Sequence, residues 1–222
     1  MLTLVLTRHG LTPRSKPEQH LGQKIDIELS DEGRAQAEAL ARRLTGIELW
    51  KIVSSPLVRA RQTAEIVAGG RTIDIDARLA EMDYGRWEGM TYEQIEELDA
   101  QERSSWEEDP ATRACPGGES GNDVSRRVRA FLGELLEDHV ARHGSSDATE
   151  WPVLAVAHSS TNRILMCVAL DLPVREFRQR FSQGQVNLTV LRFEHGDGPA
   201  DARLVLANDL AHVRPAGATP WE

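Results

Sequence analysis

Short runs of apolar and β-branched residues alternate along this chain with longer segments whose apolar residues recur at helical spacing. The four clearest runs are residues 2–7, 50–54, 72–76 and 152–157. Strand-length runs separated by helix-length segments are typical of a mostly parallel sheet that is covered by helices. The pattern therefore predicts an α/β fold, namely a three-layer α/β/α sandwich with a mostly parallel open sheet.

Start signals precede three of the four helical segments. Ser30 and Thr91 are N-cap residues, and Gln94 completes a capping box with Thr91. Ser55 and Pro56 predict a cap and a first-turn proline for another helix. The four predicted helices cover residues 31–44, 57–68, 92–101 and 122–144, the last of which ends at a glycine.

Two further apolar runs lie near the end of the chain. Residues 185–193 and 202–209 predict two late strands that could pair as a hairpin around residues 195–201. A chain of 222 residues with 40% hydrophobic residues is long enough for one sizeable core, and it contains no internal repeat. We therefore expect a single domain over residues 1–222, with a helical lid insertion around residues 90–120.

The composition excludes several classes of partner. A net charge of −9 argues against a nucleic acid or a membrane surface, because either would need a basic face. No run reaches the roughly 18 apolar residues of a membrane span, and the first residues lack the features of a signal peptide, so we expect a cytoplasmic protein. Cys115 and Cys167 form no C-x-x-C pair, which argues against a disulfide framework or a thiolate zinc site. We expect Cys167 to be a core residue.

Chemically active side chains follow the ends of the predicted strands. Residues 8–10, Arg-His-Gly, end the first strand, and His158 follows residues 152–157 directly. Arg59 comes in the first turns after residues 50–54, and Glu81 follows 72–76 by a short loop. In open α/β sheets, ligands bind beyond the carboxyl ends of the strands. We therefore expect these side chains to meet at one edge of the sheet.

This set of residues suits the transfer of a phosphoryl group. Guanidinium groups such as those of Arg8 and Arg59 match the acceptor oxygens of a phosphoryl group. A neutral His9 imidazole can attack phosphorus if its other ring nitrogen donates to a backbone carbonyl. Glu81 can supply a proton to the leaving oxygen, and His158, if protonated, can stabilise the charge that develops on the phosphoryl oxygens.

Six blocks of the sequence resemble the histidine phosphatase superfamily, in the branch that contains cofactor-dependent phosphoglycerate mutases and small bacterial phosphatases such as α-ribazole phosphatase. The resemblance implies a phosphoglycerate mutase-like fold, a phosphorylated His9, a phosphate pocket completed by Arg8, Arg59 and His158, and Glu81 as proton donor. The matching blocks are LTRHGLT (6–12), IELSDEGRAQAEALARRL (27–44), SSPLVRARQTAE (54–65), LAEMDYGRWEGMTYEQI (79–95), PGGES (116–120) and VAHSSTNR (156–163).

The chain departs from the family pattern at two positions. Ser15 stands where many members have an asparagine, and Ser159 follows His158 where many members have a glycine. Both serines are candidates for substrate binding. The resemblance also places Thr12, Leu21 and Gly22 at the mouth of the pocket.

The lid region bears on the choice between a phosphatase and a mutase. Residues 90–115 contain two basic residues, Arg103 and Arg113, and eight acidic residues: Glu93, Glu96, Glu97, Asp99, Glu102, Glu107, Glu108 and Asp109. Such a lid should repel a substrate that carries a free carboxylate besides its phosphate. The sequence therefore predicts a phosphomonoesterase for small phosphorylated metabolites, which needs no cofactor or metal. A phosphoglycerate mutase and a noncatalytic phosphate-binding module of the same fold are the alternatives, and a homodimer through a late strand stays open.

Five other residues have simpler interpretations. Glu119 is expected to accept hydrogen bonds from loop amides and to fix the lid. His139 and His143 lie one helical turn apart, but HVARH lacks the central glutamate of a zinc protease, so we expect a solvated helix face. Trp106, like Trp87, either lines the pocket mouth or packs the lid onto the core.

Overall fold

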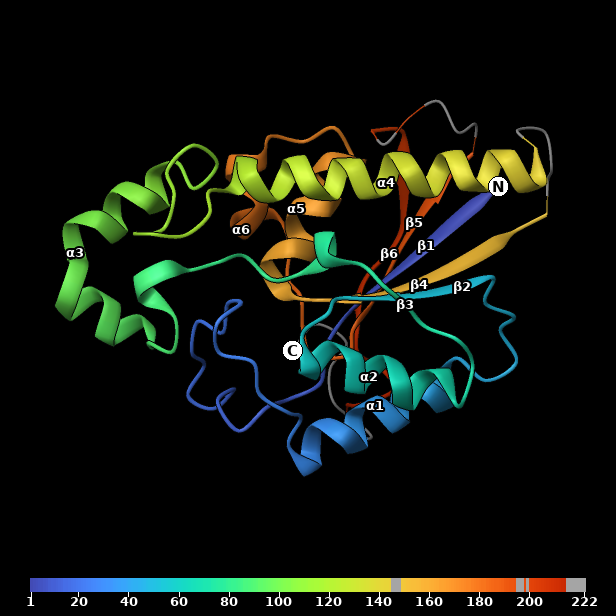
Figure 1. Ribbon diagram of the computed structural model, residues 1–222, viewed down its shortest axis with the longest axis horizontal. Helices are drawn as coiled ribbons and strands as arrows, with labels where there is room; N and C mark the ends of the chain where they lie inside the picture. The colour runs from blue at the N-terminus through green and yellow to red at the C-terminus, as the bar shows by residue number, and fades with distance from the viewer. Residues whose placement is uncertain (145–148, 195–197, 199, 215–222) are drawn as a thin grey trace.

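A six-stranded sheet forms the centre of the molecule (Figure 1). The computed structural model describes residues 1–144, 149–194, 198 and 200–214. The strand order is β3-β2-β4-β1-β5-β6. The strands are β1 (Leu2–Arg8), β2 (Lys51–Ser54), β3 (Asp74–Ile75), β4 (Trp151–Ala157), β5 (Leu188–Phe193) and β6 (Ala202–Asp209).

The sheet is mixed and open. β1 pairs in parallel with β4, β4 with β2, and β2 with β3, whereas β5 is antiparallel to both β1 and β6. The predicted α/β fold and the predicted pairing of the late strands are therefore confirmed. Of the predicted hairpin turn, residues 195–197 and 199 lie outside the described residues. Because β1, β2 and β4 are parallel neighbours, their carboxyl ends share one edge.

Helices cover both faces of the sheet (Figure 1). α1 and α2 lie on one face, and α4, α5 and α6 lie on the other, which gives the three predicted layers. The helices are α1 (Asp31–Arg43), α2 (Val58–Ala68), α3 (Tyr92–Glu108), α4 (Gly121–His143), α5 (Ser159–Ala169) and α6 (Phe177–Arg180), with short 3-10 helices at Ala77–Leu79, Gly85–Trp87 and Val174–Glu176.

Strand alternation explains the two cores. Leu2, Leu4 and Leu6 are buried against α4 and α5, whereas Val5 is buried against α1 and α2. Cys167 is fully buried in the first core, as predicted. Among the described residues, no helix has both the length and the apolar composition that crossing a bilayer requires.

Three of the predicted helix starts are correct or nearly so. The Ser30 hydroxyl caps α1 by accepting from the Gly33 amide, and Thr91 and Gln94 form the predicted capping box of α3. α4 begins one residue before the prediction, because Ser120 caps it, and ends at Gly144 as predicted.

The predicted cap of α2 is wrong, although the helix begins at Val58, only one residue after the prediction. Leu57 is its N-cap residue, and no side chain caps the helix. The Ser55 hydroxyl accepts a hydrogen bond from the Leu57 amide at 3.3 Å, and it also bonds the His158 ring at 2.7 Å. The third strand is likewise shorter than predicted, since only Asp74 and Ile75 pair with β2.

α3 projects beyond the three layers (Figure 1). It runs seven residues past the predicted end, across a kink at Asp99. The Asp99 carboxylate accepts a hydrogen bond from the Trp87 indole at 2.8 Å, and Trp106, in the second half of α3, packs edge-on against Trp87. These contacts connect the helix to the core on both sides of the kink.

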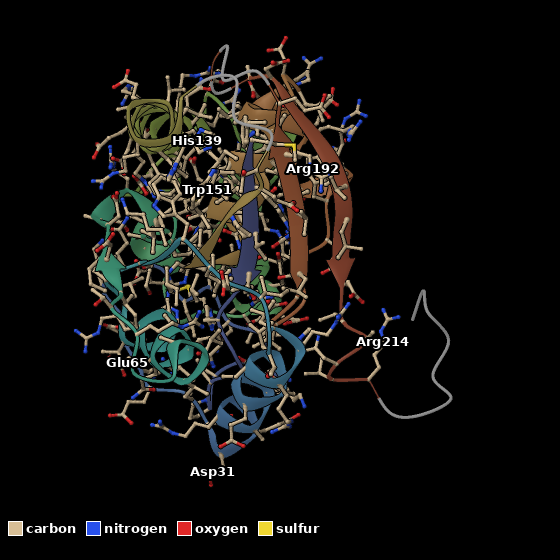
Figure 2. All side chains as sticks on the ribbon, turned by 90° about the vertical axis from the view of Figure 1, so that its right-hand side faces the viewer. Asp31, Glu65, His139, Trp151, Arg192 and Arg214 are labelled. Atoms are coloured by element: carbon tan, nitrogen blue, oxygen red, sulfur yellow. The ribbon has the colours of Figure 1, made fainter. Side chains whose placement is uncertain are left out.

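The predicted solvated face of α4 is also wrong. His139 is buried, and its ring lies 5.9 Å from that of Trp50. The His143 ring stacks on Trp151 at 3.7 Å (Figure 2 labels His139 and Trp151 at the same end of the molecule). The two histidines therefore belong to a cluster of aromatic rings near the C-terminal end of α4.

Candidate active site

The carboxyl ends of β1, β2 and β4 are extended by two backbone hydrogen bonds. The His9 amide donates to the Ala157 carbonyl at 3.0 Å, and the Ser55 amide donates to the Val156 carbonyl at 3.0 Å. Gly10 then passes so close to α1 that a Cβ atom would lie 2.5 Å from the Gly33 carbonyl oxygen. The glycine after His9 is therefore required by packing, and it lets the chain leave the strand beneath α1.

His9 is buried in its neutral form. Its Nδ1 atom lies 2.7 Å from the Gly10 carbonyl, which can only accept, so Nδ1 carries the proton and Nε2 carries the lone pair. Burial lowers the pKa of the imidazole well below its usual value, and the charges of Arg59 and Arg8 lower it further. The ring is therefore uncharged at neutral pH, with a free lone pair on Nε2.

Arg8 is held at the end of β1 by two acceptors. Its Nη1 atom donates to the Gln183 carbonyl at 3.0 Å, and its Nη2 atom donates to the Glu18 carboxylate at 2.8 Å. Burial raises the pKa of Glu18, but the charge and the hydrogen bond of Arg8 outweigh it and leave the pKa below its usual value. Arg8 is thus fixed by a carboxylate that the sequence analysis did not identify.

The guanidinium of Arg59 is held by backbone carbonyls. It donates to Leu21 at 3.0 Å, to Gly22 at 2.8 Å and to Ile25 at 3.2 Å, and its side chain is fully buried. On the other side of the same loop, the Glu88 carboxylate accepts hydrogen bonds from the amides of residues 23–25. Residues 21–25 therefore fix Arg59 through their carbonyls.

His158 lies beside His9, with 5.2 Å between the ring centroids. It is fully buried, and its Nε2 atom is 2.7 Å from the Ser55 hydroxyl. Burial lowers the pKa of His158 well below its usual value, and the charge of Arg59 acts in the same direction. His158 is therefore neutral in the free protein, so the condition attached to its predicted role, a protonated ring, is not met there.

Glu81 places its carboxylate at the N-terminus of α5. His158 is the N-cap residue of this helix but makes no side-chain cap. The Glu81 carboxylate takes that place by accepting from the amides of Ser160 at 3.2 Å and Thr161 at 3.1 Å, and it also accepts from its neighbour Met82 at 2.9 Å. One helix terminus therefore brings His158 and Glu81 together.

Three buried nitrogen atoms around His9 have no hydrogen-bond partner among the described residues. They are Nε of Arg8, Nε of Arg59 and Nδ1 of His158. Buried donors in native proteins are rarely unsatisfied, and those that are call for an explanation. Two cations and an imidazole with unused nitrogens, next to a neutral imidazole, form a site for a small anion.

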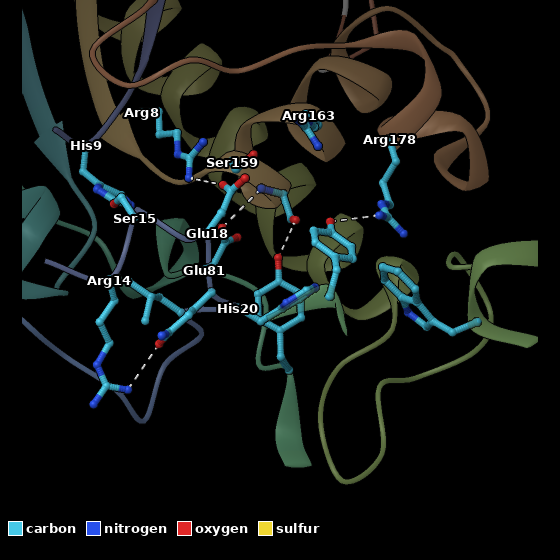
Figure 3. A pocket seen from close by; sticks show the side chains of 16 residues that line it. Arg8, His9, Arg14, Ser15, Glu18, His20, Glu81, Ser159, Arg163 and Arg178 are labelled. Carbon is cyan, nitrogen blue, oxygen red and sulfur yellow. Dashed lines mark hydrogen bonds and ion pairs between the residues drawn. The ribbon is translucent and has the colours of Figure 1, made fainter. Parts of the chain in front are cut away.

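The five residues predicted to carry the chemistry therefore lie together. His9, Arg8 and Glu81 line a pocket, together with Ser15, Ser159 and Leu21 (Figure 3). Arg59 and His158 are fully buried and are not among the residues that line this pocket, but the charge of Arg59 acts on His9 and the His158 ring lies 5.2 Å from the His9 ring. Of the remaining predicted residues, Thr12 is buried and bonds Ser15, and the Gly22 carbonyl supports Arg59, so neither lines the pocket.

Several lining residues escaped the sequence analysis. Arg163 lies one helical turn after Ser159 on α5, and this spacing was the one available signal for it. The others lie on loops or on distant helices, for which periodicity gives no spatial position. They are Arg14, Glu18, Gln19, His20, Tyr84, Tyr92 and Arg178. Ser160 also lines the pocket and follows Ser159 directly on α5. Trp106 does both things that were predicted as alternatives, because it lines the pocket and packs against Trp87.

The lid presents aromatic residues, not acids, to the pocket. Tyr92 and Trp106 of α3 line it, whereas none of the eight acidic side chains does. The lining of the pocket therefore gives no support to the expectation that this helix repels a carboxylate. Glu119 accepts from the Asp83 amide at 2.9 Å, which confirms its predicted role on a loop amide.

The described residues contain no group of three or more histidine, cysteine, aspartate or glutamate side chains arranged to hold a metal ion. Both cysteines are buried and unpaired.

Comparisons with known proteins agree with this geometry. The sequence profile of the Histidine phosphatase superfamily (branch 1) matches residues 4–206. Glucosyl-3-phosphoglycerate phosphatase of Mycobacterium tuberculosis is 38% identical over 191 residues, 85% of this chain and 84% of that protein. Phosphoserine phosphatase 1 of Hydrogenobacter thermophilus is 31% identical over 179 residues, 80% of each chain. The structure of a mycobacterial glucosyl-3-phosphoglycerate phosphatase with inorganic phosphate superposes with a TM-score of 0.82, at 35% identity, over 96% of this chain and 99% of that one.

Proposed function

The chain belongs to branch 1 of the histidine phosphatase superfamily and is a phosphomonoesterase, and from this premise we propose that it hydrolyses small phosphate monoesters through a phosphohistidine on His9. The observation that carries the proposal is the neutral, buried His9, whose Nδ1 proton is fixed by the Gly10 carbonyl beside three unsatisfied nitrogens. A nucleophile with a free lone pair and an anion site around it are what phosphoryl transfer to nitrogen requires.

The first half reaction forms a bond from His9 Nε2 to phosphorus. The bond from phosphorus to the ester oxygen breaks, and Glu81 gives its proton to that oxygen. Arg8, Arg59 and the Nδ1 atom of His158 bind the three other phosphoryl oxygens and stabilise their charge in the transition state. Ser55 holds the His158 ring in place through Nε2.

The second half reaction releases phosphate. The Glu81 carboxylate takes a proton from a water molecule, whose oxygen attacks phosphorus, and the bond to His9 Nε2 breaks. Ser15 and Ser159 lie on the pocket wall, where they can bind the leaving group. No step needs a metal ion or a cofactor, since the guanidinium groups supply the positive charge.

We propose for the rest of the molecule the domain organisation, the compartment and the oligomeric state that the sequence predicts. Residues 1–222 form one domain, with α3 as a lid whose Tyr92 and Trp106 border the pocket. The enzyme acts in the cytoplasm, where its unpaired cysteines stay reduced. β6, an edge strand with Leu204 and Val205 exposed, supports a homodimer, which light scattering during size-exclusion chromatography would detect or refute.

Turnover of p-nitrophenyl phosphate tests the function. The purified enzyme should release phosphate at the same rate with and without EDTA, and His9→Ala should lower kcat by roughly 10³-fold or more. Stabilisation of the variant by vanadate in thermal melting shows that its anion site is still folded. A loss of activity in EDTA would contradict the metal-independent reaction, and interconversion of 2- and 3-phosphoglycerate faster than phosphate release would identify a mutase.

A further inference from the structure

The pocket continues from the phosphoryl site onto a wall that is rich in arginine. Arg8, Arg14, Arg163 and Arg178 line it, against two glutamates, Glu18 and Glu81. This excess of positive charge stands in a chain whose net charge is −9. The wall therefore extends the positive charge of the phosphoryl site to groups beside it.

Three of these arginines already have acceptors. Arg8 pairs with Glu18, and Arg14 donates to the Gln19 side chain at 3.5 Å. Arg178 donates to Glu107 at 3.3 Å and to the Tyr92 hydroxyl at 3.0 Å, and its guanidinium lies over the Trp106 ring.

Arg163 differs from them. In the described part of the chain it makes no hydrogen bond or ion pair, and its Nε atom is buried without an acceptor. In the view of Figure 3 it lies between Arg8 and Arg178. Glu18 acts on it through charge only, because the hydrogen bond of that carboxylate goes to Arg8. Arg163 is therefore an uncommitted cation of the wall, meaning that its guanidinium has no hydrogen-bond or ion-pair partner among the described residues.

The position of Arg163 is unfavourable for a cation in the free protein. Burial lowers the pKa of its guanidinium, and the charge of Arg8 lowers it further. It also lies in the second turn of α5, near the positive end of the helix. A partly buried charge without a counterion costs free energy unless a ligand supplies the opposite charge.

We propose that Arg163 binds a carboxylate of the substrate, so that the enzyme selects phosphate monoesters that carry a carboxylate beside the ester. One uncommitted guanidinium offers one positive charge and a planar fork of donors, which matches one planar carboxylate. Ser159 and Arg163 share a face of α5, so this carboxylate lies beyond the leaving oxygen, on the same wall. The inference depends on the proposed hydrolysis at His9 and adds its substrate class.

O-phosphoserine and O-phosphoethanolamine test the inference, because they differ only by the carboxylate. The wild-type enzyme should have the higher kcat/KM on phosphoserine. Arg163→Met should lower the ratio of the two kcat/KM values about 10- to 100-fold, chiefly through KM, since one charge-assisted contact is lost. Arg163→Lys, which keeps the charge but not the fork, should fall between the two.

Arg61→Met is the matched control. Arg61 is exposed on α2, so this variant has the same change in net charge away from the pocket and should keep the wild-type ratio. The inference would be overturned if Arg163→Met kept the wild-type ratio of the two kcat/KM values, or if the wild-type enzyme did not prefer phosphoserine. Continued release of phosphate from phosphoethanolamine would show that the proposed hydrolysis itself still holds. Absence of release from every ester would overturn the proposed function instead. Should Arg163→Met not fold, Arg163→Gln gives the same comparison.

Discussion

Glu81 is the residue whose chemistry depends most on its surroundings. Three backbone amides fix its carboxylate at the start of α5. Glu81→Gln keeps the size of the side chain and removes the proton. It should lower kcat about 10²- to 10⁴-fold on an alkyl phosphate, whose leaving oxygen needs a proton. Steady-state kinetics on glycerol phosphate measures this loss.

A substrate with a better leaving group is the control for Glu81→Gln. p-Nitrophenolate leaves without protonation, so Glu81→Gln should lose far less activity in the first half reaction on p-nitrophenyl phosphate. Equal losses on both esters would show that Glu81 acts by position or in the attack of water, and not by protonating the leaving oxygen.

At the scale of residues, the sequence was informative where chemistry follows a strand directly. His9 and His158 come one residue after β1 and β4, so their meeting at one edge follows from parallel pairing. Glu18 and Arg178 could not be predicted, because a loop and a distant short helix bring them to the pocket. The neutral state of His158 also needed the structure, since it arises from burial beside Arg59.

At the scale of elements, the exit of β1 depends on close packing against α1. A Cβ atom on Gly33 would lie 2.0 Å from the Leu11 carbonyl oxygen. Gly33→Ala must therefore move either α1 or the loop after His9, and should cost about 1–3 kcal/mol of unfolding free energy. Thermal unfolding and kcat, measured on the same variant, should both fall.

Gly133 offers a matched control within α4. A Cβ atom there would meet nothing within 4 Å, so Gly133→Ala should stabilise the protein by about 0.5–1 kcal/mol, as alanine does in a helix interior. A Gly33→Ala variant as stable as this one would contradict the close contact between Leu11 and α1.

Element boundaries were predictable where capping is local. Ser30, Thr91 and Gly144 act on backbone groups within a few residues, and all three are correct. Ser55 is not the cap of α2, and sequence could not show that its hydroxyl bonds His158, which lies 103 residues away, as well as the Leu57 amide. The extension of α3 failed for a similar reason, since the contact of Trp106 with Trp87 follows from tertiary packing.

At the scale of the whole molecule, buried histidines connect folding to pH. The pKa values of His9, His20, His158 and His212 are lowered, first of all by burial. Below pH 6.5 the unfolded chain binds protons that the folded chain does not. The unfolding free energy should therefore fall as pH is lowered from 6.5, by up to about 1.4 kcal/mol per pH unit for each fully buried histidine.

Urea unfolding between pH 7.5 and 5.0 measures this dependence, in a range above the one in which carboxylates become protonated. His9→Ala removes one of the fully buried rings and should flatten the curve. A curve that is level over this range in the wild type would contradict the neutral, buried state of the histidines.

The distribution of charge was beyond prediction from composition. The sequence correctly showed that an acidic chain must hold an anion with a local basic cluster. It did not show that the acids of α3 face away from the pocket while Arg163 and Arg178 face it. Helical spacing gives the faces of α3, but not which face meets the core.

The central claim is that the phosphoryl group moves to His9 before water receives it. Rapid mixing of enzyme with substrate, an alkaline quench and mass spectrometry of the peptides measure this directly. The account predicts a burst of leaving group and one phosphoryl group on His9 Nε2, which is stable in alkali, is released by acid and is absent from His9→Ala. A phosphoryl group on another residue, or turnover with neither a burst nor a phosphorylated peptide, would contradict it.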